Sequence, residues 1–228
     1  MQRVIDITGT IQEGMWSYPD PFPDVLIKPL PEVPWVKGDV YCEIFDGLCS
    51  QTGTYLETPA HFYGNDKSYL LIDVDVATLM NRDCIVLNVG LKDPPPGKDR
   101  YGITVEDLES CPGAGEIKPG DAILVGTGWG THWMERDFLE KGPFFTYDAM
   151  QWLIGKKPYI LGGDSARWEN LEEPQGFFPD FYAADILMLG PCVNLEKVQS
   201  HAVKLTALPM KIVRTSCAPC RAVLIECD

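Results

Sequence analysis

Four polar side chains in one short stretch of the chain are the best candidates for chemistry. They are the amide of Gln51, the phenol of Tyr55, the carboxyl group of Glu57 and the imidazole of His61. If residues 51–57 form a strand, the alternation of side chains places the first three on one face. The sequence therefore predicts a polar row that ends near an imidazole.

Two residues in this stretch determine its predicted shape. Gly53 lacks a side chain, so we expect it to leave open space within the polar row. Pro59 cannot continue a strand ladder, and the chain should turn there. That turn would bring His61 back beside the end of the row.

These groups could support hydrolysis in two ways, and the sequence leaves both open. In the first, Gln51, Glu57 and His61 hold a divalent metal (Mn, Mg or Zn) that activates water, with oxygen-rich ligation favouring manganese, magnesium or calcium over zinc. In the second, Glu57 acts as general base and His61 as general acid. The amide of Gln51 and the hydroxyl of Tyr55 would then hydrogen-bond a carbonyl oxygen as negative charge develops on it.

The same stretch resembles the signature His-x-Gly-Thr-His-x-Asp-x-Pro-x-His of the cyclase family of metal-dependent hydrolases, which includes kynurenine formamidase and isatin hydrolase. The positions that match the signature are Gly53, Thr54, Pro59 and His61. The three positions that bind metal in the family read Gln51, Tyr55 and Glu57 here. This sequence thus keeps the scaffold residues of the signature, whereas its metal-binding positions are altered.

Further resemblance lies in the second half of the chain. Alignment on residues 193–195 places Phe178 and Gly190 at the family's other metal-binding positions, which hold His and Glu. Neither residue can ligate a metal. We interpret the acidic side chains of residues 169–173 as a solvated loop rather than as substitute ligands.

The resemblance spans essentially the whole chain and implies its fold and function. It implies one α/β domain over residues 1–228, of the swivelling β/β/α type, with a central mixed sheet or flattened barrel and peripheral helices. It also implies a homo-oligomer, either a dimer or a tetramer, that hydrolyses a small amide, lactam or lactone or catalyses the reverse cyclisation. The alternative is an altered homologue that binds a small ligand or a partner without metal. The retained Glu57 and His61 pair favours the enzyme.

Two other segments are candidates for substrate binding. Residues 15–23 form a proline-rich aromatic loop, in which Trp16 and Tyr18 either line a pocket or simply pack on the core. Asp164 follows two glycines at the end of a predicted strand, residues 159–161, where α/β proteins often place functional groups. Its alternative role is that of a cap or turn residue.

Regular elements must position these groups. Alternating or continuous apolar runs predict strands at 3–8, 25–28, 39–45, 83–89, 121–125, 159–161, 205–213 and 222–226. The strand at 39–45 should join the central sheet and lead into the polar row. Helices are predicted at 105–108, capped by Thr104, and at 146–154.

Composition excludes several classes of partner. The 228 residues carry a formal net charge of -14, which argues against nucleic acid because phosphate binding needs clustered Lys and Arg. No apolar run approaches the length that spans a bilayer, and the first residues lack an apolar leader. We therefore expect a cytoplasmic protein that binds a small-molecule substrate and neither nucleic acid nor membrane.

The remaining motifs are interpreted as structural. Cys217 and Cys220 have the spacing of a zinc knuckle or redox pair, but no second pair or suitable context accompanies them, so we expect buried, reduced thiols. Residues 126–130 lack the Gly-x-Gly-x-x-Gly spacing and should form a turn after a strand. His132 is expected at the surface, and His201 in a structural role.

Overall fold

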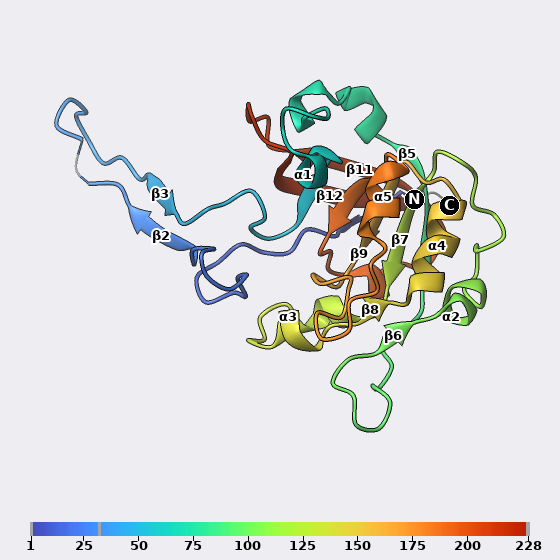
Figure 1. The fold of residues 1–228 in the computed structure, drawn as a ribbon. Helices are drawn as coiled ribbons and strands as arrows, with labels where there is room; N and C mark the ends of the chain where they lie inside the picture. Colours follow the sequence, from blue (N-terminus) through green and yellow to red (C-terminus); the bar gives the residue numbers. More distant parts are fainter. Residues whose placement is uncertain (1, 32, 227–228) are drawn as a thin grey trace.

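A closed, mixed β-barrel forms the centre of the computed structural model, which describes residues 2–31 and 33–226 (Figure 1). The strands of this sheet are β1 (Arg3–Asp6), β4 (Tyr55–Glu57), β5 (Arg82–Asn88), β7 (Ala122–Gly126), β9 (Ile160–Gly163), β10 (Leu187–Gly190), β11 (Ala202–Pro209) and β12 (Cys217–Glu226). Their order is β1-β12-β11-β5-β7-β9-β10-β4, and β4 pairs back onto β12 to close the ring. The predicted α/β fold with a flattened barrel is thereby confirmed.

Parallel and antiparallel pairing divide this barrel. Strands β5, β7, β9 and β10 run parallel to one another, whereas β4, β11 and β12 pair antiparallel. Parallel neighbours need crossover connections, and these contain α2 (Val105–Glu109), α4 (Tyr147–Gly155) and α5 (Phe178–Ala183). The shorter elements are α1 (Ala60–Tyr63), α3 (Phe138–Lys141), β6 (Gly102–Ile103), β8 (Phe144–Phe145), η1 (Leu71–Asp73), η2 (Val76–Leu79), η3 (Trp129–His132) and η4 (Leu195–Lys197).

Side-chain alternation along the strands builds two apolar cores. In β7, Ala122 and Leu124 belong to the cluster that fills the barrel interior. Ile123 and Val125 belong to the cluster beneath α4 and α5 on the outer face of the barrel (Figure 1). Because one strand supplies both cores, its sequence is a continuous apolar run rather than an alternating one.

A third apolar cluster fixes the proline-rich loop to the body. Trp16 stacks on Phe138 with ring centroids 5.2 Å apart and meets the edge of Trp133 at 5.3 Å. These rings are buried together with Trp129. The loop is therefore ordered, as predicted, and its start is anchored in a core.

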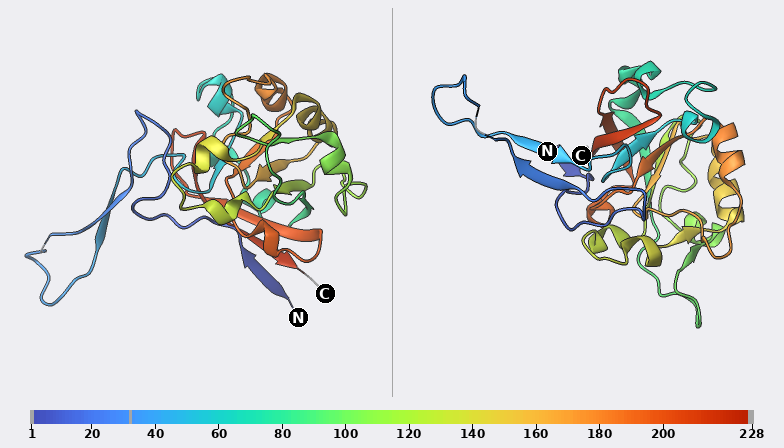
Figure 2. Two further views of the ribbon diagram at one scale, coloured as in Figure 1. Left: turned by 90° about the horizontal axis from the view of Figure 1, so that it is seen from below. Right: turned by 60° about the vertical axis from the view of Figure 1, so that its left-hand side comes forward.

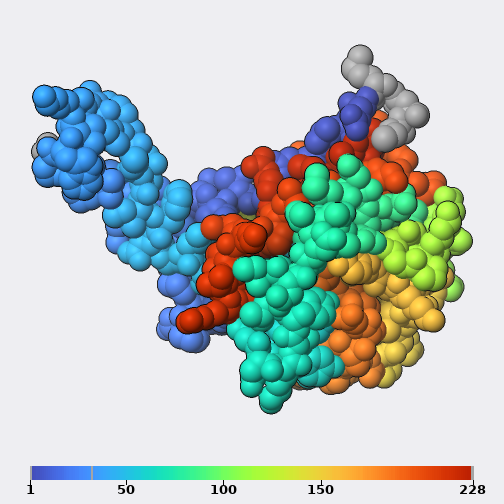
Figure 3. Space-filling view, turned by 90° about the horizontal axis from the view of Figure 1, so that it is seen from above, coloured from blue at the N-terminus to red at the C-terminus, as the bar shows by residue number. Residues whose placement is uncertain are grey.

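A two-stranded arm projects from the barrel. Strand β2 (Leu26–Pro29) pairs only with β3 (Glu43–Asp46), and all residues of both strands are exposed. Figures 1 and 2 show this arm extending away from the barrel, and the space-filling view separates it clearly from the body (Figure 3). At its base the two ends meet, since a Cβ on Gly47 would lie 2.0 Å from the carbonyl oxygen of Asp24.

The arm corrects one prediction. Residues 39–45 were expected to join the central sheet, but the strand there is shorter and lies in the arm. Closure of the barrel between β4 and β12 is the physical reason, because it removes the sheet edge beside the polar row that another strand would need. The strand expected at 205–213 also ends earlier, at Pro209.

Two other sequence-based interpretations, a helix cap and a pair of buried thiols, are confirmed. Thr104 caps α2 by accepting a hydrogen bond from the amide of Asp107. Cys217 and Cys220 are buried free thiols within β12, as expected. Throughout residues 2–31 and 33–226, no helix combines the length and apolar character needed to cross a membrane.

Candidate active site

The polar row lies where a turn enters β4. Only residues 55–57 are in strand conformation, because Gly53 has a φ of 72° and bends the chain before them. A Cβ at Gly53 would lie 2.8 Å from Cγ1 of Ile11. The predicted open space at Gly53 is therefore wrong: glycine is needed there for a left-handed turn and a close contact.

The four predicted polar residues nevertheless line one cavity. Gln51, Tyr55, Glu57 and His61 surround a space of about 180 Å³ on the outer side of β4 and β10. Its other walls come from Tyr18, from segment 166–171 and from α5. Sequence elements far apart in the chain thus converge on the row.

The turn after β4 places the imidazole as predicted. Pro59 precedes the first residue of α1 and has a helical φ of -55°. The amide of Thr58 donates to the carbonyl of Ser216 on the neighbouring segment, 2.8 Å away, which fixes the turn. His61 Nδ1 consequently lies 3.7 Å from Glu57 Oε2.

Glu57 is a buried carboxyl group with an unusual pKa. Its side chain is 1% exposed, and burial raises its pKa to about 7 although a hydrogen bond from the hydroxyl of Tyr182 acts in the opposite direction. Burial also lowers the pKa of His61, so the imidazole is mainly neutral at pH 7. At neutral pH the cavity therefore holds a carboxyl group whose pKa lies near that pH, beside a mainly neutral imidazole.

Two tyrosines and an amide form a directed hydrogen-bond chain in the same cavity. The Tyr18 hydroxyl donates to the carbonyl of Ala166 at 3.2 Å, and it lies 3.1 Å from the Tyr55 hydroxyl. Because a carbonyl only accepts, Tyr55 donates to Tyr18, while the amide of Gln51 approaches Tyr55 at 3.5 Å. Burial raises the pKa of Tyr18 to about 12 and that of Tyr55 well above its usual value. Both phenols therefore stay protonated.

Two of the predicted substrate-binding residues lie outside the cavity wall. Trp16 packs edge-on behind Tyr18, with ring centroids 5.7 Å apart, and is part of the third apolar cluster. Asp164 accepts hydrogen bonds from the amides of Thr127 and Gly128, both 2.9 Å away, and from the hydroxyl of Thr127 at 2.8 Å. Burial raises the pKa of Asp164 to about 6, although these hydrogen bonds act to lower it. The structure places it as the support of the turn after β7.

Sequence reasoning missed Tyr182 and Arg167. Tyr182 lies four positions after Phe178, which puts both on one face of α5, and their rings stack at 5.8 Å. That aromatic spacing was the available signal for Tyr182. Arg167 follows the strand end by a few residues, and only the fold brings it to the cavity.

The donor set of the cavity does not fit a resident divalent metal. Within residues 2–31 and 33–226, no three His, Cys, Asp or Glu side chains come together as a ligand group. Glu57 and His61 are the two strong donors, and the phenol of Tyr55 stays protonated. Phe178, at a family metal position, lines the cavity with carbon atoms.

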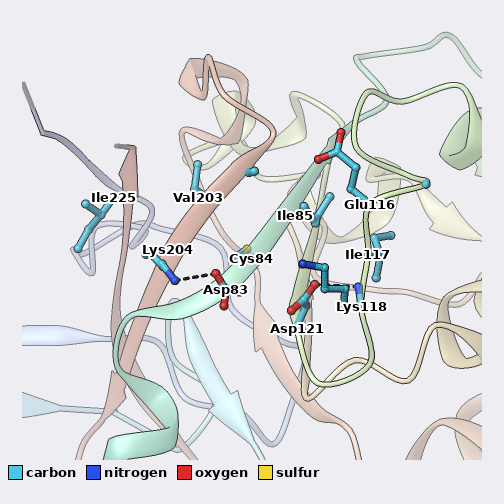
Figure 4. A pocket seen from close by; sticks show the side chains of 12 residues that line it. Asp83, Cys84, Ile85, Glu116, Ile117, Lys118, Asp121, Val203, Lys204 and Ile225 are labelled. Atoms are coloured by element: carbon cyan, nitrogen blue, oxygen red, sulfur yellow. Dashed lines mark hydrogen bonds and ion pairs between the residues drawn. The ribbon is translucent and has the colours of Figure 1, made fainter. Parts of the chain in front are cut away.

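A larger hollow elsewhere lacks these chemical features. It measures about 570 Å³ and lies against β5 and β11 (Figure 4). Its carboxylates already have partners: Asp83 Oδ1 pairs with Lys204 Nζ at 2.6 Å, Glu116 pairs with His201 at 3.0 Å, and Asp121 accepts from the backbone amide of Lys118 at 2.8 Å. Size alone therefore does not make it the better site.

Comparisons with known proteins agree with this fold. The family model described as "Putative cyclase" matches residues 5–170. A search of curated proteins finds no match. Among solved structures, an isatin hydrolase bound to the product analogue thioisatinate has a TM-score of 0.80 at 20% identity, covering 100% of this chain and 93% of that chain.

Two further structures are similar over most or all of their length. A predicted metal-dependent hydrolase from Bacillus stearothermophilus has a TM-score of 0.74 at 21% identity, covering 100% of both chains. Isatin hydrolase A from Ralstonia solanacearum has a TM-score of 0.74 at 20% identity, covering 98% of this chain and 92% of that chain. At such identities the likeness establishes a shared fold.

Proposed function

Since the chain belongs to the cyclase family, we propose that it is a hydrolase of small amides, lactams or lactones that works by acid–base catalysis at Glu57 and His61. The observation that carries this proposal is the buried Glu57 carboxyl group, whose pKa is raised to about 7 beside an imidazole in a small cavity. A base with a pKa near the working pH is the most effective general base. The isatin hydrolases among its structural relatives agree with a cyclic amide as substrate.

The geometry supports the following reaction. The substrate carbonyl faces Tyr55 and Gln51. When the substrate binds, the Tyr55 O–H turns from Tyr18 to the carbonyl oxygen, and together with an N–H of Gln51 it stabilises the negative charge that develops there. Ionised Glu57 removes a proton from water as the water oxygen bonds to the carbonyl carbon. The proton then passes to neutral His61, 3.7 Å away, and from there to the leaving nitrogen or oxygen as its bond to carbon breaks.

Tyr182 completes this arrangement as a positioning residue. Its hydroxyl donates to Oε1 of Glu57 and leaves Oε2 directed toward His61. The burial of Glu57 strengthens it as a base, because a desolvated carboxylate binds a proton more tightly. No step in this sequence uses a metal, in agreement with the donor set of the cavity.

A screen in the absence of metal tests the proposal. Purified protein in buffer with a chelator should hydrolyse at least one member of a panel of formamides, lactams and lactones, and Glu57→Gln should lose this activity. Glu116→Gln, which alters an exposed carboxyl group paired with His201, is the matched control and should retain it. Turnover only after addition of manganese or zinc would contradict the metal-free mechanism.

The second function is ligand binding without turnover, which the same cavity also supports. It predicts that panel compounds protect the protein against thermal unfolding without being converted. Binding of this kind raises the melting temperature by mass action. Conversion of any panel compound that depends on Glu57 rejects it.

We further propose that the protein is a homo-oligomer whose subunits meet through the arm. Large apolar side chains gather there with high exposure, at 83% for Trp35, 86% for Tyr41 and 63% for Phe45. An isolated two-stranded ribbon is marginally stable in water, and such a patch is typical of an interaction site. A symmetric dimer would cover two arms at once.

A further inference from the structure

A guanidinium group on the cavity wall is only weakly paired. The side chain of Arg167 lines the cavity and is 18% exposed. In the described part of the chain its single ion pair joins Nη1 to Oε1 of Glu140 over 3.9 Å, and the Glu140 side chain is 55% exposed. A pair of this length and exposure contributes little to stability.

The backbone that carries Arg167 is firmly held. The guanidinium of Arg100 donates to the carbonyls of Arg167 and Glu169, and also to those of Gly142 and Pro143. Two positive charges thus lie near each other. Burial lowers the pKa of Arg100 to about 10, and the charge of Arg167 adds to this effect. An anion beside Arg167 would offset that repulsion.

The acidic groups of the cavity pair with partners other than Arg167. Glu169 accepts hydrogen bonds from the amides of Gly176 and Phe177, which directs its carboxylate toward that turn. Glu57 faces Tyr182 and His61. Arg167 is therefore the charged donor that the cavity offers to a bound molecule.

We propose that Arg167 binds a carboxylate or similar anionic group of the substrate while the carbonyl group reacts at Glu57. The substrate class is then a small carbonyl compound with a negative charge remote from the bond that breaks. A planar guanidinium matches a carboxylate with two parallel hydrogen bonds. This assignment adds a substrate class to the proposed hydrolase function. It rests on that function only for the reaction at the carbonyl group.

Space for the anionic end lies next to Arg167. Arg167 and Leu171 also line a second hollow of about 630 Å³, whose wall further includes Arg100, Phe144 and both acidic and basic side chains. The catalytic cavity, at about 180 Å³, is much smaller. A substrate can thus place its reacting carbonyl in the catalytic cavity and its charged end against Arg167, with any further part of the molecule in the second hollow.

Calorimetric titration with two isosteric probes tests this inference without requiring turnover. The wild-type protein should bind benzoate about tenfold more tightly than benzamide, the effect of one charge-assisted pair in a partly buried site. Arg167→Gln should remove this preference while benzamide affinity changes by less than about twofold, which also shows that the cavity remains folded. Arg167→Lys should retain part of the preference because it keeps the charge.

Arg136→Gln is the matched control, since Arg136 is exposed and lies outside the cavity. It should bind both probes like the wild type. The inference is overturned if the wild type shows no preference for benzoate or binds neither probe, or if Arg167→Gln keeps the preference. Because Glu57→Gln can lose hydrolysis and still bind benzoate, failure of the catalytic proposal is a separate outcome.

Discussion

Glu57 combines a catalytic pKa with a cost in stability. Its folded-state pKa of about 7 lies above the ordinary value of 4.5, so the folded state binds this proton more tightly than the unfolded state. Stability therefore falls as pH rises from 4.5 to about 7, and the loss above that range is about 3 kcal/mol.

This cost predicts that Glu57→Gln is more stable than the wild type at pH 8. The substituted amide cannot ionise, and its oxygen can still accept the hydrogen bond from Tyr182. Urea unfolding at pH 8 should show a gain of roughly 2–3 kcal/mol that shrinks toward pH 4.5. A loss of stability at pH 8 would show that the carboxylate is favourably solvated or paired in the fold.

The hydroxyl of Tyr182 predicts a shift in the pH profile. Turnover should rise with pH through about 7, as Glu57 ionises. Tyr182→Phe removes the hydrogen bond that stabilises the carboxylate, so the midpoint should move to higher pH by roughly one unit. Tyr147→Phe removes a hydroxyl that donates to exposed Asp180 and is the matched control. An unchanged midpoint in Tyr182→Phe would exclude this role.

Single residues show what sequence alone could predict of the site. Tyr55, Glu57 and His61 come together as predicted because strand alternation and a proline turn are local rules. Gln51 reaches them through the left-handed turn at Gly53 and not along a strand. Asp164 follows two glycines at the end of a strand, which is an equally good local signal for a functional residue. Its oxygens nevertheless accept hydrogen bonds from the turn at Thr127. Which way a carboxylate points depends on neighbours that are distant in sequence, and that information is absent from local patterns.

At the scale of elements, the turn into β4 predicts a strict need for glycine. Gly53→Ala would place a Cβ 2.8 Å from Ile11 Cγ1 in a left-handed conformation. Urea unfolding should show a loss of at least about 1–2 kcal/mol. Gly115→Ala has no atom within 4 Å of its new Cβ and should change stability by less than about 0.5 kcal/mol. Equal effects of the two substitutions would contradict this account of the turn.

Elements were predicted better than their placement. The apolar runs that became β5, β7 and β9 are recognisable because both faces of these strands are buried. The strands of the arm have similar β-branched and aromatic residues, and only barrel closure excludes them from the sheet. Helix α5 was not predicted, because its six residues give too short an apolar pattern and Phe177 before it gives no capping signal like that of Thr104 before α2.

At the scale of the whole molecule, the arm predicts assembly. Replacement of Tyr41 and Phe45 by serine should convert the oligomer to a monomer, because it removes exposed aromatic side chains from the proposed interface. Both side chains lie on the arm, so their replacement should leave the barrel folded. Light scattering after size exclusion would measure the mass. Val76→Ser, at a site 56% exposed on η2, is the control and should leave the mass unchanged. A monomeric wild type would reject the proposed assembly.

The cytoplasmic location and the single domain over residues 1–228 stay predictions.

The contact between Asp24 and Gly47 at the base of the arm makes the arm a modular insertion. The chain leaves the barrel and returns to it at nearly the same point, so the path of the remaining chain does not depend on the arm's length. Loops between touching ends tolerate changes in length at small entropic cost. Tyr18 and Gln51 lie on either side of this junction and line the cavity. The proposed assembly surface on the arm can therefore change in evolution, or be replaced by design, without a change in the residues that line the cavity.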